Sequence, residues 1–312
     1  MAEQLVEQRP QTGFDPPWRR VVAAVAVLAS VPYAVLKVAW LAGSSIGLSD
    51  DRLLHDPVMA TANALTLVMM LAGGALAQAL VRPFGLRLPA WLVLTPAYVG
   101  SGLLGGVLLA VPVQLLLFAT GWGDANGAAN VAGGEGPIDS WVYLVVYTGF
   151  AVLGLCLFAL FPGYARRRWL RPGGWLTPMS GWRGLDRRER GIAVALGLVM
   201  VALVVAGLAV SGLRGGAIDL STLIAGAGCL AGLIMLAGRR PERAGVAAFV
   251  LAFTGSAVVA TWGLYLLLMQ VVPNPLSTEP AEPVALALLA VQVINAALTL
   301  VALRRLRPGV GR

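Results

Sequence analysis

The sequence predicts an all-α integral membrane protein that crosses the bilayer eight times. Hydrophobic residues occupy 58% of the 312 positions, and charged residues occupy only 12%, against about 25% in a soluble domain. The apolar residues gather in eight long runs, and the arginines gather in every second connection between them. The mean hydropathy is +0.79. A chain of this composition cannot cover a water-facing surface with polar groups.

Each apolar run is long enough to cross the hydrocarbon of a bilayer, which takes about 20 residues of α-helix. None alternates with a period of two over a long stretch, so a β-barrel is not expected. The first run is too long for the apolar core of a cleavable signal, and we expect a retained helix after an unordered tail. The runs cover approximately residues 20–45, 57–80, 90–119, 140–163, 191–211, 217–237, 245–271 and 283–303.

The distribution of arginine predicts the orientation. Of 22 arginines, 20 lie in the two terminal tails or in the connections on the same side as the tails. The opposite connections hold only Arg52 and Arg214, with nine acidic residues. Short cytoplasmic loops are enriched in Lys and Arg, so both termini are predicted to be cytoplasmic. The chain then divides into a cytoplasmic tail (1–18), spans 1–4 (19–163), a cytoplasmic loop (164–190), spans 5–8 (191–303) and a second tail (304–312).

The 164–190 loop interleaves arginine with tryptophan, as in YARRRWLRPGGW. Tryptophan favours the membrane interface, and clustered arginine attracts anionic headgroups. We therefore expect the lipid bilayer as the partner of this loop, and the alternative is a cytoplasmic protein. Nucleic acid is not expected, because the basic charge follows the topology. The arginines expected at headgroups are Arg166, Arg167, Arg168 and Arg171.

A weak internal repeat joins the third and seventh runs. AYVGSGLL at 97–104 matches AFTGSAVV at 252–259 with an offset of 155, and Pro83 and Pro241 are offset by 158. Four spans per half would give both halves the same orientation, which is a parallel 4+4 repeat. Such repeats occur in many transporters and also in folds that transport nothing.

The third run is longer than a straight crossing requires. About 30 residues of helix extend roughly 45 Å, against about 30 Å of hydrocarbon. Proline at 96 and 112 and glycine between 100 and 106 predict a kink, a break or a strong tilt. The alternative is a tilted helix whose Gly102-x-x-x-Gly106 pair permits close helix packing.

Lys37 is the only lysine in the chain, and it lies within the first apolar run. Tyr33, Lys37 and Trp40 recur at i, i+4 and i+7 and therefore share one helical face. An ionisable group inside a membrane is costly and suggests a functional site with a partner. Two interpretations stay open: a structural ion pair, or a site for an anionic or carboxylate-bearing ligand. The candidates for the ion pair are Asp50, Asp51 and Asp56.

Further polar residues are predicted at the same outer level as Lys37. Together they suggest a polar vestibule that opens outward, although a membrane interface also gathers Tyr, Trp and Gln. The residues are Asn63, Gln114, Tyr143, Tyr147, Gln270 and Gln292, with Asn295 nearer the middle of the membrane.

The sequence gives no indication of catalysis. It holds one histidine, His55, and two cysteines, Cys156 and Cys229, so a usual zinc site is not expected. No Asp or Glu lies deep in a run, which argues against a carboxylate proton relay. We expect no catalytic residue, metal or cofactor, and a membrane enzyme is the third choice of function.

Two stretches carry a resemblance to known proteins. VPYAVLKVAWLAGSSIGL and LRLPAWLVLTPAYVGSGLL resemble a group of actinobacterial multi-pass membrane proteins without an assigned function. The resemblance covers mainly the first three runs and implies that P-Y-x-x-L-K-x-x-W is a family feature. It implies a bacterial plasma membrane and supplies no substrate.

Two classes of function remain for the chain. The first is a transporter-like or solute- or lipid-binding protein with an outward-facing polar site near Lys37. The alternative is a non-transporting scaffold or sensor that binds a cytoplasmic partner through the 164–190 loop. The sequence alone does not fix the oligomeric state.

The predicted orientation can be tested by labelling. Cysteines placed at Asn126 and Arg183 should react with an impermeant thiol reagent from opposite sides of the membrane, because the arginines place these loops on opposite sides. Reaction of both from outside intact cells would refute the topology.

Overall fold

The computed structural model describes residues 16–120, 137–168, 186–211, 217–238, 245–273, 275 and 282–305. Within these ranges, eight helices are long and apolar enough to cross a membrane, and they match the eight predicted runs. The all-α fold with eight spans is therefore confirmed. The helices are α1 (Pro17–Leu41), the short α2 (Arg52–His55), α3 (Pro57–Val81), the 3₁₀ turn η1 (Pro83–Leu86), α4 (Ala90–Ala119), α6 (Ser140–Arg168), α7 (Arg187–Ser211), α8 (Ala217–Ala237), α9 (Gly245–Val271) and α10 (Pro283–Arg305).

Local sequence explains where several helices begin. Proline occupies the first turn of α1 and α3, where its missing N–H costs nothing. The Asp56 carboxylate accepts a hydrogen bond from the backbone N–H of Met59 at 2.9 Å and caps α3. At the start of α7, Asp186 and Glu189 accept hydrogen bonds from each other's backbone N–H, at 2.7 and 3.1 Å. This reciprocal pair is a capping box.

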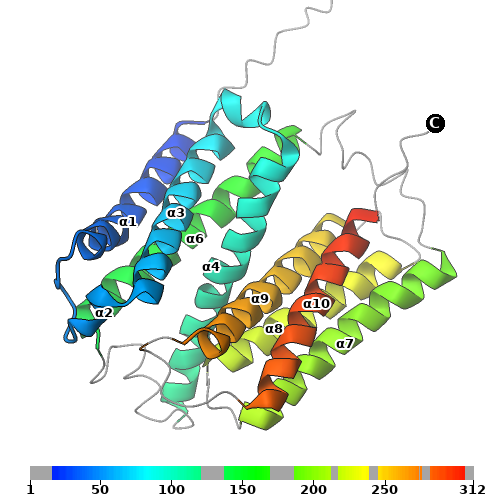
Figure 1. Cartoon of the computed structure of the whole chain (residues 1–312). Helices are drawn as coiled ribbons and strands as arrows, with labels where there is room; N and C mark the ends of the chain where they lie inside the picture. The colour runs from blue at the N-terminus through cyan, green and yellow to red at the C-terminus, as the bar shows by residue number, and fades with distance from the viewer. Residues whose placement is uncertain are drawn as a thin grey trace, which may run out of the picture.

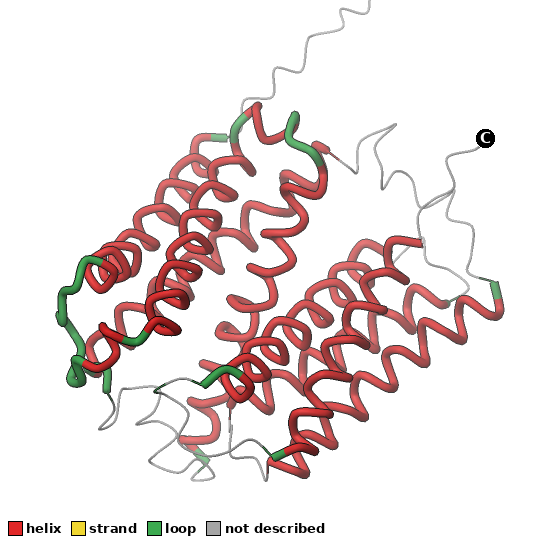
Figure 2. The backbone as a smooth tube through the Cα atoms, in the orientation of Figure 1, coloured by secondary structure: helices red, strands yellow, loops and turns green. Residues whose placement is uncertain are grey.

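The spanning helices form two groups that lie side by side (Figure 1). In the first group, α1, α3 and α6 pack against one another; in the second, α7, α8, α9 and α10 form a closed ring of contacts. α4 joins the groups, because it packs against α6 on one side and against α9 and α8 on the other. The tube in Figure 2 shows the start of α1 and the end of α10 at the same end of the bundle. We name this end the inner end and the opposite one the outer end, after the orientation that the arginines predict.

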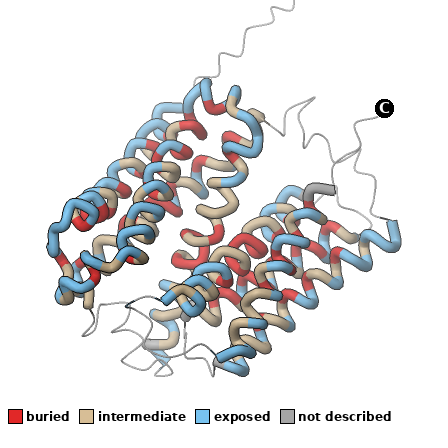
Figure 3. The backbone as a smooth tube through the Cα atoms, viewed as in Figure 1, coloured by how far each residue is buried: buried red, intermediate tan, exposed pale blue. Residues whose placement is uncertain are grey.

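Each group has its own apolar core, and in Figure 3 the buried positions face the inside of the groups. Large apolar side chains also cover the outside: Leu28 and Leu144 are 68% and 70% exposed. Helices that are apolar on both sides are expected where the surroundings are lipid. The first core includes Ala26, Leu80, Leu153 and Leu160, and the second includes Met200, Cys229, Leu233 and Val259.

The long third span is one continuous helix. α4 runs from Ala90 to Ala119 through Pro96 and Pro112, so the broken-helix alternative is excluded. Its glycines serve close packing, as the other alternative expected. A Cβ added at Gly102 would overlap the Ala257 carbonyl of α9, and one added at Gly106 would overlap the Trp262 ring. A kink at the prolines stays a prediction.

The α4–α9 contact brings together residues that the sequence match pairs at an offset of 155. The Tyr98 and Phe253 rings meet edge to face, with centroids 5.1 Å apart. Gly102 lies against Ala257, which is its counterpart in the same match. Helices related by a two-fold axis contact each other through equivalent residues where they lie beside that axis.

A pair of glycines tests the role of this contact. Gly102→Ala should destabilise the protein by about 1–3 kcal/mol, because the new Cβ forces α4 away from α9. Gly100→Ala is the matched control: a Cβ there meets nothing within 4 Å, and alanine favours a helix by about 1 kcal/mol relative to glycine. Thermal unfolding in detergent, followed by tryptophan fluorescence, measures both. Equal melting temperatures for the two variants would contradict the packing.

Candidate functional site

Lys37 lies near the outer end of α1 and is only 8% exposed. Its ammonium donates a hydrogen bond to Asn63 Oδ1 of α3 at 2.7 Å. An ammonium has three donors, and no other acceptor among the described residues receives one from Lys37. The buried charge is therefore held by a neutral amide.

Two aromatic rings complete the surroundings of the ammonium. Its nitrogen lies 4.8 Å from the centroid of the Tyr33 ring and 4.6 Å from that of Trp40. The one-face spacing of these residues, expected from the sequence, thus produces two cation–π contacts, which contribute about 0.5–2 kcal/mol each depending on desolvation. Trp40 is fixed in turn, because its indole N–H donates to the Ile46 carbonyl at 2.8 Å.

The ion pair considered for Lys37 is not present among the described residues. Asp50 accepts a hydrogen bond from the backbone N–H of Arg52 and lies 3.7 Å from its guanidinium, and Asp56 caps α3. Asp51 is exposed, and only its backbone carbonyl has a side-chain contact, with His55. The physical reason is local: carboxylates at the start of a helical turn bond to nearby backbone amides more readily than to a side chain deeper in the bundle.

The structure brings only some of the predicted vestibule residues together. Lys37, Tyr33, Trp40 and Asn63 form one cluster, named the Lys37 cluster below. On α6, the rings of Tyr143 and Tyr147 are stacked with centroids 6.4 Å apart.

Among the described residues, the other predicted ones make no hydrogen bond to Lys37. Gln114 is half-buried on α4, and Gln270 is exposed near the end of α9. Gln292 is buried on α10 in the second helix group, where Asn295 donates to the Leu196 carbonyl of α7 at 3.0 Å. None of the three glutamines is hydrogen-bonded to Lys37.

Sequence reasoning missed two residues that interact with Tyr33 of the Lys37 cluster, Thr66 and Tyr265. Thr66 of α3 interacts with the Tyr33 side chain. Tyr265 of α9 lies close enough to Tyr33 and Tyr147 for an electrostatic interaction, and its ring meets Trp262 edge to face at 5.6 Å. In the sequence, the feature that could have identified Tyr265 is its i, i+3 spacing from Trp262 in the outer third of a span. The electrostatic surroundings of Tyr33 therefore extend to the second helix group.

The arrangement is a buried positive charge flanked by two aromatic rings. A cation beside rings, with a carboxamide as its hydrogen-bond partner, suits an anionic group with an apolar portion. Within the described ranges, no three His, Cys, Asp or Glu side chains lie close enough together to hold a metal ion.

The arginines at the inner end have a different arrangement from the one expected. Arg167 donates to the Leu80 carbonyl at 2.9 Å, and Arg168 donates to the Gly85 carbonyl at 3.0 Å and to Leu88. Arg167 and Arg168 thus bond to backbone carbonyls at the end of α3 and in the turn after it, which have no helical partner. The Tyr164 hydroxyl also donates to Gly85, at 2.8 Å.

Arg166 is exposed, so the headgroup contact expected there stays a proposal. Arg171 and the tryptophans of the 164–190 loop lie outside the described residues.

Comparison with known proteins assigns nothing further: the chain matches no protein-family profile, no curated protein and no solved structure.

Two neighbouring arginines separate a structural role from a lipid-binding one. Arg168→Gln should destabilise the protein by about 1–3 kcal/mol, because it leaves the Leu88 carbonyl and one bond to Gly85 unsatisfied. Arg166→Gln should leave the melting temperature in detergent unchanged, because that side chain is exposed. An equal loss of stability in both variants would contradict the internal role of Arg168.

Proposed function

We propose that this polytopic membrane protein is a transporter-like or solute- or lipid-binding protein that holds an anionic group at Lys37. One observation carries the proposal: a buried ammonium whose contacts in the described part of the chain are an amide oxygen and two rings. A charge is costly inside a membrane unless it is paired. An anionic ligand would supply the missing charge.

The position of the cluster supports a ligand site. Tyr33 and Lys37 come from α1 and Asn63 from α3, and Tyr265 of α9, in the other helix group, interacts electrostatically with Tyr33. Sites of membrane transporters are built where two halves of the fold meet, so that relative movement of the halves changes access. The cluster lies nearer the outer end than the middle, which suits a ligand arriving from outside.

The α4–α9 contact gives a second line of support. Tyr98 with Phe253 and Gly102 with Ala257 are counterparts in the sequence match, and each pair is in contact. We take this as support for a parallel 4+4 repeat about an axis between α4 and α9. A two-fold arrangement of this kind would allow the helix groups to rock against each other.

The chemical class of the ligand follows from the groups around the ammonium. A carboxylate or phosphate would accept its remaining hydrogens, and an apolar portion of the ligand would lie beside the Tyr33 and Trp40 rings that flank the ammonium. Such an anionic group could belong to a small solute or to a headgroup of the outer leaflet. We place the protein in a bacterial plasma membrane on the basis of the sequence resemblance.

Thermal shifts of the purified full-length protein test the site. Acetate, succinate, benzoate and phosphate serve as soluble probes, and phosphatidylglycerol against phosphatidylcholine as lipid probes. One anion should stabilise the wild type, by about 2.7 kcal/mol at one hundred times its Kd. Lys37→Met should abolish this stabilisation while changing the melting temperature without ligand little. Arg52→Gln, which removes an exposed outer charge, should retain it.

The same data distinguish the other outcomes. A soluble anion that acts alone indicates a solute site, and phosphatidylglycerol acting alone indicates a headgroup site. If Lys37→Met lowers the melting temperature by itself and no probe stabilises the wild type, the lysine is structural and the proposal fails.

A further inference from the structure

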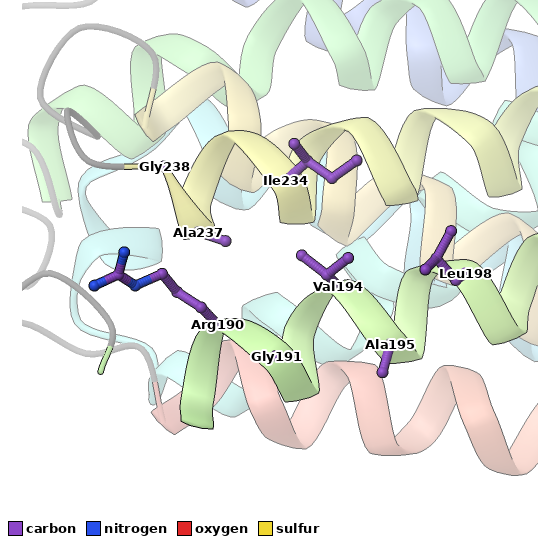
Figure 4. A pocket seen from close by; sticks show the side chains of 8 residues that line it. All are labelled: Arg190, Gly191, Val194, Ala195, Leu198, Ile234, Ala237 and Gly238. Carbon is purple, nitrogen blue, oxygen red and sulfur yellow. The ribbon is translucent and has the colours of Figure 1, made fainter. Parts of the chain in front are cut away.

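The ammonium of Lys37 is almost fully covered, so a ligand reaches it only if part of the structure moves. Lys37 is 8% exposed, and the rings of Tyr33 and Trp40 that flank it are each 7% exposed. The hollow in Figure 4 gives no route to it, because the residues that line this hollow belong to α7, to α8 or to the residue that follows α8. Access therefore depends on what covers the outer end of α1.

One segment leaves α1 directly beside the Lys37 cluster: residues 42–49, named the outer strap below. It begins where α1 ends, and Figure 2 shows it as a loop at the outer end of the first helix group. Gly43 and Gly47 have φ angles of 88° and 74°. Glycine adopts this left-handed conformation without steric cost. The strap turns back far enough for the Ile46 carbonyl to meet Trp40 of α1.

Trp40 lies between the strap and the ammonium. Its indole N–H donates to the Ile46 carbonyl at 2.8 Å, and its ring centroid lies 4.6 Å from the nitrogen of Lys37. Leu48 of the strap also packs against the small apolar cluster that contains Trp40. The position of the strap therefore determines both the cover over the Trp40 ring and one of its hydrogen bonds.

The far end of the strap is attached to the chain before α6 by few bonds. Leu48 pairs with Ile138 in an isolated antiparallel bridge, and two backbone hydrogen bonds of 3.0 Å flank this pair. The Ser49 hydroxyl donates to the Asp139 carboxylate at 2.7 Å in an exposed position. Short paired strands are marginally stable alone, and segments with few, exposed hydrogen bonds open at a low free energy. The strap can therefore open while the helices stay folded.

We infer that the outer strap is a lid over Lys37: its opening admits a small anion from outside, and its closure returns the Trp40 ring to the ammonium. Gly43 is the hinge, since it joins α1 to the strap and has open space around it. The identity of the ligand rests on the function proposed above, whereas the opening of the strap does not.

The only lysine of the chain reports its own access. Sulfosuccinimidyl acetate, a water-soluble anion, acetylates an amine that it can reach, and mass spectrometry of the peptide with Lys37 measures the rate in the purified full-length protein. Trp40→Phe keeps a ring but removes the bond to Ile46. It should raise the rate about fivefold, which corresponds to about 1 kcal/mol for one hydrogen bond.

Ser49→Ala should also raise the rate, because it removes the bond to Asp139 without changing the Lys37 cluster. Two matched controls should react at the wild-type rate. Trp91→Phe changes an exposed tryptophan near the start of α4. Ser45→Ala changes an exposed strap residue whose side chain makes no hydrogen bond to the described residues.

A reversible lock gives the opposite test. Leu48 and Ile138 form a non-hydrogen-bonded antiparallel pair. The Cα atoms of such a pair are about 4.5 Å apart, a separation that a disulfide can span. Leu48→Cys with Ile138→Cys should lose most of the acetylation rate when oxidised and regain it after reduction. The natural Cys156 and Cys229 are buried and stay in place.

Melting temperatures are compared first, and Ser49→Ala carries the test if Trp40→Phe does not fold. Equal rates in the oxidised and reduced lock would overturn the inference, because Lys37 would then be reached by another route. So would an equal rise in the controls, or no acetylation in any variant. The thermal shifts with anions test the ligand separately: if no anion binds but the lock controls acetylation, the proposed function fails and the strap is a lid over a structural lysine.

Discussion

The two helix groups are held together by the close contact between α4 and α9. In a bilayer, burial of apolar surface does not drive helices together as it does in water, so association depends on close packing and on hydrogen bonds. Gly102 and Gly106 allow the α4 backbone to approach Ala257 and Trp262 of α9. The separation of these two helices therefore determines where Trp262 and Tyr265 lie relative to α1 and α6.

α1 carries two buried cations, and the protein accommodates them in opposite ways. Arg19, 5% exposed, donates to backbone carbonyls of Leu160 and Leu80, which are strong neutral acceptors with fixed positions. Lys37 has one carboxamide and two rings. The planar fork of an arginine suits several fixed acceptors, whereas a lysine is a compact charge on a flexible stem with three rotatable donors. This contrast is why the binding proposal rests on Lys37 and not on Arg19.

The number and limits of the spans were predictable from sequence, because hydrocarbon admits only segments of sufficient length and apolarity. The face shared by Tyr33, Lys37 and Trp40 was predictable from helical periodicity. The partner of Lys37 was not predictable in this way. The negative charge of Asp56 made it the expected partner, but Asp56 caps α3. Asn63, two turns further along α3, accepts the hydrogen bond of Lys37 instead. Choices of this kind depend on competition between local backbone groups and distant side chains, which spacing does not reveal. The same applies to Arg167 and Arg168. Their positive charge predicted contact with anionic lipid headgroups, but their side chains donate hydrogen bonds to backbone carbonyls of the protein.

The bonds of Arg19 have a consequence for the order of assembly. Its partners Leu80 and Leu160 lie 61 and 141 residues later in the chain. At a synthesis rate of about 5–20 residues per second, Leu160 follows Arg19 out of the ribosome by roughly 7–28 seconds. During that interval the guanidinium has to stay in water or among headgroups at the inner surface, which holds the beginning of the first span at that depth. The bond to Leu160 therefore closes only after the fourth of the eight spans has been made, whereas α1 can pack against α3 as soon as the second span is complete.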